Sequence, residues 1–169
     1  WDAATLREHM SFSPHGAIAA VAYSPDGKQL VTGSWDNSAK IWDVASGQVI
    51  RKLVGGHTGF INCARYAPDG QSILTAGDDG LAILWDATTG EVLRRFVGHT
   101  GRVFCVSFNP QGDRIVTGSQ DRTAIIWNSL TGEPLQKCTG HAWSVLCAGF
   151  SRDGSRLLTG SEDGTARLW

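Results

Sequence analysis

Residues 98–127 read GHTGRVFCVSFNPQGDRIVTGSQDRTAIIW, and four landmarks of this stretch return at fixed spacing along the whole chain. The landmarks are a His, a Thr 18 residues later, an Asp four residues after the Thr and a Trp six residues after the Asp. The last three copies keep these spacings, and the first copy is one residue shorter between His and Thr. The four copies are His15, Thr32, Asp36 and Trp42; His57, Thr75, Asp79 and Trp85; His99, Thr117, Asp121 and Trp127; and His141, Thr159, Asp163 and Trp169. A period near 42 residues indicates a repeat architecture.

The bulk composition fits one soluble globular domain. The chain has 169 residues, of which 41% are hydrophobic and 18% are charged. Its net charge is −1 and it contains no run of Lys or Arg, so we expect no nucleic acid and no membrane surface among its partners. No stretch is apolar for long enough to span a bilayer, and none reads as a signal peptide. The chain begins with Trp1 and its one Met is Met10, which suggests a fragment, a processed chain or an engineered piece.

Three of the four cysteines follow the repeat, the fourth being Cys138, and together they form no metal or disulfide pattern. Cys63, Cys105 and Cys147 are 42 residues apart, and Ala20 fills the same position in the first copy. A position that is filled by either Ala or Cys is typical of a strand site that is buried and has room only for a small side chain. There is no C-x-x-C spacing, so we expect no metal and no cofactor. Thiols that are not arranged to pair favour a reducing compartment, and we therefore expect a cytoplasmic protein.

Each copy reads as four short strands. In the second copy we expect strands at 60–66, 71–76, 81–85 and 91–96. Turn sequences separate them, such as Pro68-Asp69-Gly70, in which Pro fixes φ and Gly accepts a positive φ. Short strands with a turn about every ten residues, and no helical period, predict an all-β fold.

The Gly-His dipeptide, the Thr-Gly-Ser-x-Asp type of turn and the Ile-Trp-Asp ending resemble the WD-repeat family of β-propellers. The resemblance covers essentially the whole chain as one WD-repeat domain, with repeats at about 1–42, 43–85, 86–127 and 128–169. The first copy departs from the pattern with Pro14-His15, and the third ends in Trp127-Asn128. The resemblance implies four-stranded antiparallel blades arranged around an axis.

In this family the four landmarks form a hydrogen-bonded tetrad inside each blade. The resemblance implies that the Trp indole donates to the Thr hydroxyl, the Thr to the His, and the His to the Asp, so that every polar group has a partner. Thr, His and Asp are also the residue types of a nucleophilic triad. An active site is not normally repeated four times with a Trp at fixed phase, so we expect a structural role and no enzyme activity.

The number of blades in the ring stays open at this stage. The third strand of a repeat ends at Trp1-Asp2, a rim strand is expected near 5–10, and the third strand at 165–169 has no rim strand after it. The chain could close on itself as four blades, form part of a seven- or eight-bladed ring, or form half of an eight-bladed homodimer. Sheet twist disfavours four blades, so we expect one of the other two arrangements.

The resemblance also implies a non-catalytic platform for protein or peptide partners. In the family, contact positions lie three and five residues after the His and just before the Asp. The first copy gives Ala17 and Ala19 at the first two of these positions. The candidate contact residues are Trp35, Phe60, Asn62, Asp78, Arg102, Phe104, Gln120, Trp143, Ser144, Leu146 and Glu162. Trp, Phe and Arg are enriched where interfaces derive most of their binding energy or are most buried.

Two other interpretations compete with that of a platform for protein partners. Some of the aromatic residues could pack against neighbouring blades, and the whole chain could be a purely structural or self-assembling module with no outside ligand. An enzyme built on a propeller needs an acid–base pair facing its channel, and the candidate positions do not supply one.

Overall fold

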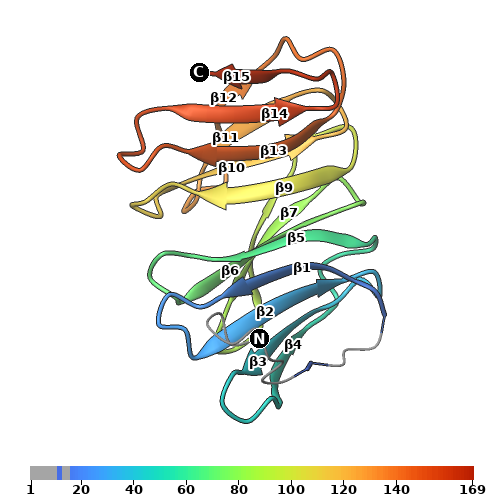
Figure 1. Cartoon of the computed structure of the whole chain (residues 1–169), viewed down its shortest axis with the longest axis vertical. Coiled ribbons are helices and arrows are strands. Elements are labelled where there is room, and N and C mark those ends of the chain that lie inside the picture. Colours follow the sequence, from blue (N-terminus) through green and yellow to red (C-terminus); the bar gives the residue numbers. More distant parts are fainter. Residues whose placement is uncertain (1–10, 13–15) are drawn as a thin grey trace, which may run out of the picture.

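The computed structural model of the chain describes residues 11–12 and 16–169, and it is built from antiparallel sheets (Figure 1). Each sheet is a meander in which strands that follow one another in sequence also pair with one another. The chain therefore has the all-β blade architecture that the sequence predicts. His15 and the rim strand expected near residues 5–10 lie outside the described residues.

The first two sheets each contain four strands in sequential order. The first sheet comprises β1 (Ile18–Tyr23), β2 (Gln29–Ser34), β3 (Ala39–Asp43) and β4 (Val49–Leu53). The second comprises β5 (Ile61–Tyr66), β6 (Ser72–Gly77), β7 (Ala82–Asp86) and β8 (Val92–Phe96). The strands predicted for the second copy are confirmed to within one residue at each end.

The third sheet repeats this pattern, and the last sheet is smaller. The third comprises β9 (Val103–Phe108), β10 (Arg114–Ser119), β11 (Ala124–Asn128) and β12 (Pro134–Cys138). The last comprises β13 (Val145–Phe150), β14 (Leu157–Ser161) and β15 (Ala166–Leu168). Over the described residues this last sheet has three strands, in agreement with the expected lack of a rim strand.

The turn chemistry explains where strands end. Gly70 closes the turn between β5 and β6 by donating its N–H to the carbonyl of Ala67 over 2.9 Å. Its φ of 73° lies in the left-handed region, which glycine enters without a steric penalty. Asn37 and Arg122 adopt the same region, with φ of 66° and 70°, where the second copy has Gly80.

Each sheet has two faces, which we name from the second sheet. The tryptophan face carries Tyr66, Ile73 and Trp85, and it packs against the first sheet. The cysteine face carries Cys63 and Leu74, and it packs against the third sheet. The third and last sheets meet in the same way, so three apolar cores lie between four sheets.

The four sheets form an open row. The first sheet lies at the bottom of Figure 1 and the last at its top, so the two do not meet. Sheet twist disfavoured closure of one chain into four blades, and the arrangement agrees with that expectation. The part of the chain that the structure describes contains no helix long and apolar enough to cross a membrane.

One sequence expectation fails at the end of the row. Cys63 and Cys105 are buried, at 6% and 8% exposed, as their repeat position predicts. Cys147 occupies the same position but is exposed. The physical reason is that Cys63 and Cys105 are each covered by the next sheet, whereas no sheet formed by the described residues covers the cysteine face of the last sheet.

Candidate protein-interaction surface

The tetrad of the second sheet links a loop, two strands and a turn. Trp85 on β7 donates its indole N–H to the Thr75 hydroxyl on β6 over 2.8 Å. The same hydroxyl lies 2.7 Å from Nε2 of His57, which precedes β5. On the other side of the ring, Nδ1 of His57 lies 2.9 Å from Oδ2 of Asp79 in the turn between β6 and β7. Each polar atom of this buried chain therefore has a partner.

The proton positions follow from this geometry. Thr75 has one hydroxyl proton to donate. Its hydroxyl oxygen lies 2.7 Å from His57 Nε2 and 3.4 Å from the Ile83 carbonyl oxygen, so the histidine is the closer acceptor. Nε2 therefore accepts, and the proton of the neutral imidazole is on Nδ1, which donates to Asp79. Burial lowers the pKa of His57, and the favourable charge of Asp79 offsets this effect only in part. His57 is neutral at pH 7.

The third and last tetrads have the same geometry. His99 Nε2 lies 2.7 Å from the Thr117 hydroxyl, and His141 Nε2 lies 2.8 Å from the Thr159 hydroxyl. Nδ1 of these two histidines lies 2.8 Å from Asp121 and 2.9 Å from Asp163, respectively. Trp127 and Trp169 complete the tetrads, each with a 2.9 Å bond to its Thr. In the first sheet, Trp42 bonds Thr32 over 3.0 Å, and His15 lies outside the described residues.

The aspartates extend each tetrad to the backbone of the His loop. Oδ2 of Asp79 accepts the N–H of Thr58 over 2.9 Å, and Asp121 accepts that of Thr100 over 3.1 Å. Burial alone would raise the pKa of Asp121, but hydrogen bonds from Thr123 and His99 outweigh it and hold the pKa below its usual range. The loop that carries the tetrad His, which we call the His loop, and the turn that carries the tetrad Asp are thus held together by hydrogen bonds in each of these sheets.

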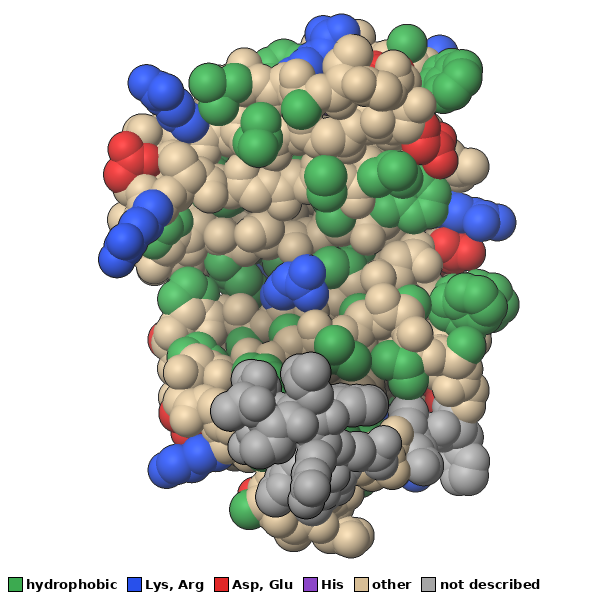
Figure 2. All heavy atoms as spheres, viewed as in Figure 1, with side chains coloured by type: hydrophobic (Ala, Val, Ile, Leu, Met, Phe, Trp, Pro, Cys, Tyr) green, Lys and Arg blue, Asp and Glu red, His purple; other side chains and the backbone are tan. Residues whose placement is uncertain are grey.

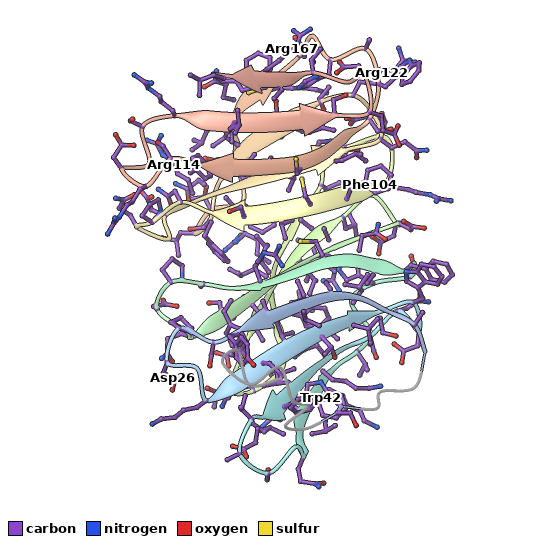
Figure 3. The ribbon with its side chains drawn as sticks, in the orientation of Figure 1. Asp26, Trp42, Phe104, Arg114, Arg122 and Arg167 are labelled. Atoms are coloured by element: carbon purple, nitrogen blue, oxygen red, sulfur yellow. The ribbon has the colours of Figure 1, made fainter. Side chains whose placement is uncertain are left out.

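We name the edge formed by these loops and turns the histidine edge; it comprises residues 35–38, 56–60, 77–81, 98–102, 119–123, 140–144 and 161–165. Phe104, near the start of β9, lies toward the right of Figure 3, and Asp26 in the opposite turns lies toward the left. Apolar side chains gather along the same right-hand side of the space-filling view (Figure 2). All eleven candidate contact residues lie on this edge or near the start of the strands that leave it, and one of them, Ser144, is buried there.

Two aromatic candidates stack on one another. The rings of Trp35 and Phe60 lie 5.4 Å apart between centroids, with 12° between their planes. Trp35 belongs to the first sheet and Phe60 precedes the second, so the pair crosses the junction between blades. Both remain open to solvent, at 52% and 45% exposed. The sequence left open whether these aromatics pack against a neighbouring blade, and the structure shows that these two do so while they stay exposed.

The next junction has a charged pair at the equivalent positions. Asp78 of the second sheet lies 3.5 Å from Nε of Arg102, which precedes the third sheet. The Arg102 side chain is 55% exposed and that of Asp78 is 19% exposed. Asp78 also accepts a 2.8 Å hydrogen bond from the amide of Asn62. The same two positions are therefore in contact at both junctions. One is the residue just before the tetrad Asp of a sheet, and the other lies three residues after the tetrad His of the next sheet.

A β-bulge changes the direction of the candidate side chains that lie five residues after the tetrad His. In the second sheet, Ile61 pairs with Gly77 but Cys63 pairs with Ala76, which leaves Asn62 as the extra residue. The same shift makes Phe104 the extra residue of β9 and Leu146 that of β13. Bulges turn a side chain out of the regular alternation. Leu146 is consequently 44% exposed although it lies near the start of an apolar strand.

The remaining candidates differ in accessibility. Trp143 is 62% exposed, and Gln120 and Glu162 are also exposed. Ser144 is buried, at 8% exposed, so it has almost no surface to offer a partner. Within the described ranges, no three His, Cys, Asp or Glu side chains come together as a metal site.

Comparison with known proteins agrees with this architecture. The family model described as "WD domain, G-beta repeat" matches residues 6–43, 47–86, 90–128 and 132–169. The chain belongs to the WD-repeat family. It is 34% identical to cilia- and flagella-associated protein 52 of Mus musculus over 62 residues, 37% of this chain and 10% of that protein. It is 48% identical to nuclear distribution protein nudF of Aspergillus niger over 46 residues, 27% of this chain and 10% of that protein. The alignments thus span about 10% of the length of these curated relatives.

Proposed function

We propose that this WD-repeat chain is a non-catalytic scaffold that binds protein or peptide partners through the histidine edge. The observation that carries the proposal is the stacked pair of Trp35 and Phe60, which leaves two large rings 52% and 45% exposed. Arg102 lies at the next junction and offers a mostly exposed guanidinium group. Exposed aromatic and Arg side chains that are held in place are the types that anchor protein interfaces.

The tetrads supply the rigidity that such an edge needs. Each described His loop is held by its Asp through both the imidazole and a backbone N–H. A surface fixed before binding loses less conformational entropy when a partner docks. Phe104, Leu146 and Trp143 extend the proposed contact area, and Asn62, Asp78, Gln120 and Glu162 give it polar positions. Ser144 is left out of the contact area because it is buried.

The burial of the tetrads supports a non-catalytic role for them. The Thr75 and Thr117 side chains are 0% exposed, so a substrate cannot reach either hydroxyl. Both ring nitrogens of His57 already have partners within the protein. A general base needs a free nitrogen within reach of the substrate proton, and these histidines do not offer one.

We place the protein in the cytoplasm as part of the same proposal. Cys63, Cys105, Cys138 and Cys147 are free thiols, which suits a reducing compartment. The names of the matched relatives refer to cilia and flagella and to nuclear distribution, in further support of this proposal.

The proposal is tested by quantitative affinity capture with the parent chain and a Trp35→Ala/Phe60→Ala variant. The matched control is Leu130→Ala/Leu135→Ala, which removes two exposed apolar side chains, 78% and 51% exposed, outside the histidine edge. We expect partners that the parent and the control retain to be lost from the Trp35/Phe60 variant. A variant that binds every captured partner as tightly as the parent contradicts the proposal.

A further inference from the structure

A hollow of about 410 Å³ lies between the first and second sheets, at the edge of the row opposite the histidine edge. We name it the Arg51 hollow. The residues that line it include Asp26, Gln29, Ile50, Arg51, Asp69 and Gln71. Figure 3 labels Asp26, which lies in the turn between β1 and β2 on this edge. Both walls come from neighbouring sheets inside the row, so the hollow is a feature of a junction between two blades.

Arg51, on β4, is held in place by two contacts with the second sheet. Its Nη1 donates to the carbonyl oxygen of Thr89 over 3.2 Å. Its aliphatic stem lies against Gly90, where an added Cβ would come within 2.7 Å of Arg51 Cδ. A guanidinium group that is positioned in this way loses little conformational entropy when it binds a ligand.

The Nε of Arg51 has no partner. It is the one buried side-chain nitrogen without a hydrogen-bond partner in the part of the chain that the structure describes. The ion pairs of the described residues do not include Arg51 either, although two carboxylates line the same hollow. A buried donor without an acceptor is costly, so a site that retains one indicates that a ligand or a water supplies the acceptor.

The next junction contains the same arginine contact without an unpartnered nitrogen. Arg94 on β8 donates its Nη1 to the carbonyl oxygen of Thr131 over 3.0 Å, and its Cδ lies against Gly132. Among the described residues, Nε of Arg94 is not a buried atom that lacks a partner. The contact with the following turn therefore does not explain the free Nε of Arg51.

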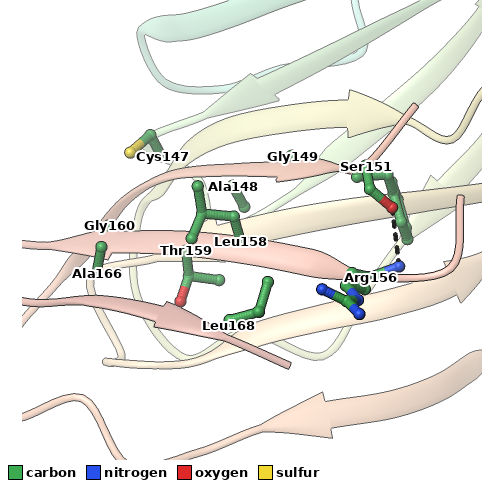
Figure 4. Close-up of a pocket in the computed structure, with 11 residues that line it drawn as sticks. Cys147, Ala148, Gly149, Ser151, Arg156, Leu158, Thr159, Gly160, Ala166 and Leu168 are labelled. Carbon is green, nitrogen blue, oxygen red and sulfur yellow. Dashed lines mark hydrogen bonds between the residues drawn. The ribbon is translucent and has the colours of Figure 1, made fainter. Parts of the chain in front are cut away.

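The hollow on the cysteine face of the last sheet, drawn in Figure 4, has a different chemistry. Leu158 and Leu168 give it a mainly apolar lining. The hydrogen bond drawn there joins the N–H of Arg156 to the Ser151 hydroxyl over 3.0 Å. No described side chain in it has a buried nitrogen without a partner, so it does not share the feature of the Arg51 hollow.

The free side of Arg51 fits a carboxylate. Nε and Nη2 present two parallel N–H groups on one side of the planar guanidinium group. This pair remains available when Nη1 is bonded to Thr89. A carboxylate accepts both bonds at once, which gives a short and strong charge-assisted pair.

Two carboxylates in the hollow select what accompanies that group. Asp26 and Asp69 line it from the turns of the first and second sheets. Hydrogen bonds from the Ser24 hydroxyl and from the Lys28 N–H lower the pKa of Asp26, which is therefore charged at pH 7. These carboxylates repel an anion with two charges, such as phosphate, and attract a cation that lies next to the ligand carboxylate.

We propose that the Arg51 hollow binds the carboxylate side chain of a Glu or Asp in a peptide partner, with a Lys or Arg of the same peptide beside Asp26 and Asp69. The two charges of such a segment match the two kinds of charge in the hollow. The site lies on the opposite edge from the histidine edge, and it uses none of the residues that carry the scaffold proposal.

The test is a titration of the isotope-labelled chain followed by NMR, in which each Arg Nε–H gives its own signal. The probe is the capped dipeptide acetyl-Glu-Lys-amide. We expect a saturable shift of the Arg51 Nε–H signal and none of the Arg94 signal. Acetyl-Gln-Lys-amide should bind at least about tenfold more weakly, because it lacks a charged acceptor. Acetyl-Glu-Gln-amide should bind about twofold to fivefold more weakly, the range for an exposed ion pair.

Variants test the residues one at a time. Arg51→Lys keeps the charge but lacks the paired N–H groups, so it should weaken binding of acetyl-Glu-Lys-amide by about tenfold. The backbone amide signal of Gly70, which lines the hollow, gives this affinity. The matched control Arg94→Lys should bind like the parent. Asp26→Asn/Asp69→Asn should weaken binding of acetyl-Glu-Lys-amide and strengthen that of inorganic phosphate, because it removes both the attraction and the repulsion.

Three results overturn the proposal. They are a Glu-Lys peptide that causes no saturable shift of the Arg51 signal, a Gln-Lys peptide that binds as tightly, and an Arg94→Lys variant that loses as much affinity as Arg51→Lys. The peptide comparison uses the parent chain, so the test stays decisive if a variant misfolds. Trp35→Ala/Phe60→Ala should bind the Glu-Lys peptide like the parent, which separates this site from the histidine edge.

Discussion

The second sheet and the last sheet are built from nearly the same pattern, yet they differ in how well they are buried. Leu74 is 0% exposed, and its counterpart Leu158 on the cysteine face of the last sheet is 54% exposed. Both sheets have the same tetrad geometry to within about 0.1 Å at the Thr hydroxyl. The contrast shows that a blade makes its own hydrogen bonds but depends on its neighbours for burial, as expected for a repeat protein.

The largest expected effect is the loss of buried leucine. Leu74→Ala should lower the free energy of unfolding by about 2–5 kcal/mol, because it removes apolar contacts and leaves a cavity. Leu158→Ala should cost less than about 0.5 kcal/mol, because the side chain is already in water. Urea unfolding of dilute monomer gives both values. Equal losses would show that the last sheet is buried after all.

The next effect concerns the tetrad donor. Trp85→Phe removes the indole N–H that bonds Thr75 and should cost about 1–3 kcal/mol, because a buried hydroxyl loses a partner. Trp169→Phe breaks the same bond to Thr159 in a more exposed place, so its cost should be smaller. Thermal unfolding of both variants makes the comparison. The account is contradicted if Trp169→Phe is the more damaging change.

The buried histidines predict a loss of stability in mild acid. Burial lowers the pKa of His57 and His99 in the folded protein below the ordinary value of 6.5. As the pH falls through 6.5, the unfolded chain takes up protons that the folded chain does not, so the free energy of unfolding falls. The fall continues until the pH passes the lowered folded pKa. Below about pH 4, the lowered pKa of Asp121 adds a second loss.

Urea unfolding at a series of pH values between 7 and 3 checks this profile. A His57→Gln variant should be less stable than the parent at pH 7 and should show a shallower decline between pH 7 and pH 5. A parent whose stability stays level or rises over that interval would contradict the lowered pKa of His57 and His99.

The smallest expected effects separate the two junction pairs on the histidine edge. A double-mutant cycle on Trp35 and Phe60 should give a coupling energy of about 0.5–1.5 kcal/mol, as for other aromatic pairs. A cycle on Asp78 and Arg102 should give about 0.2–1 kcal/mol, because the pair is open to solvent. Added salt at 1 M should remove the second coupling and leave the first. Coupling energies with the opposite salt dependence would contradict this assignment.

Much of the fold could be read from the sequence because local chemistry determines it. The positions of Thr75 and Trp85 predicted two paired strands, and Pro68 and Gly70 predicted the turn before them. The exposure of Cys147 could not be read in this way, since its repeat position is the same as that of Cys63. Exposure depends on whether another sheet lies against the residue, and that is a property of the assembled row.

The sequence predicted where the candidate surface lies, but not how its side chains contact one another or how exposed they are. The repeat placed Trp35 and Phe60 on one edge, but their stacking needs the distance between two sheets. The bulge at Asn62 is defined by how β5 pairs with β6, and the sequence of β5 alone does not give that pairing. The burial of Ser144 likewise follows from packing between sheets, whereas the exposed Trp143 beside it belongs to the same loop.

The most direct test of the central claim, that neighbouring blades determine the state of each face, is native hydrogen exchange. The amides of β6 and β10 should exchange most slowly and those of β14 and β15 markedly faster. Equal protection of β6 and β14 would contradict the account.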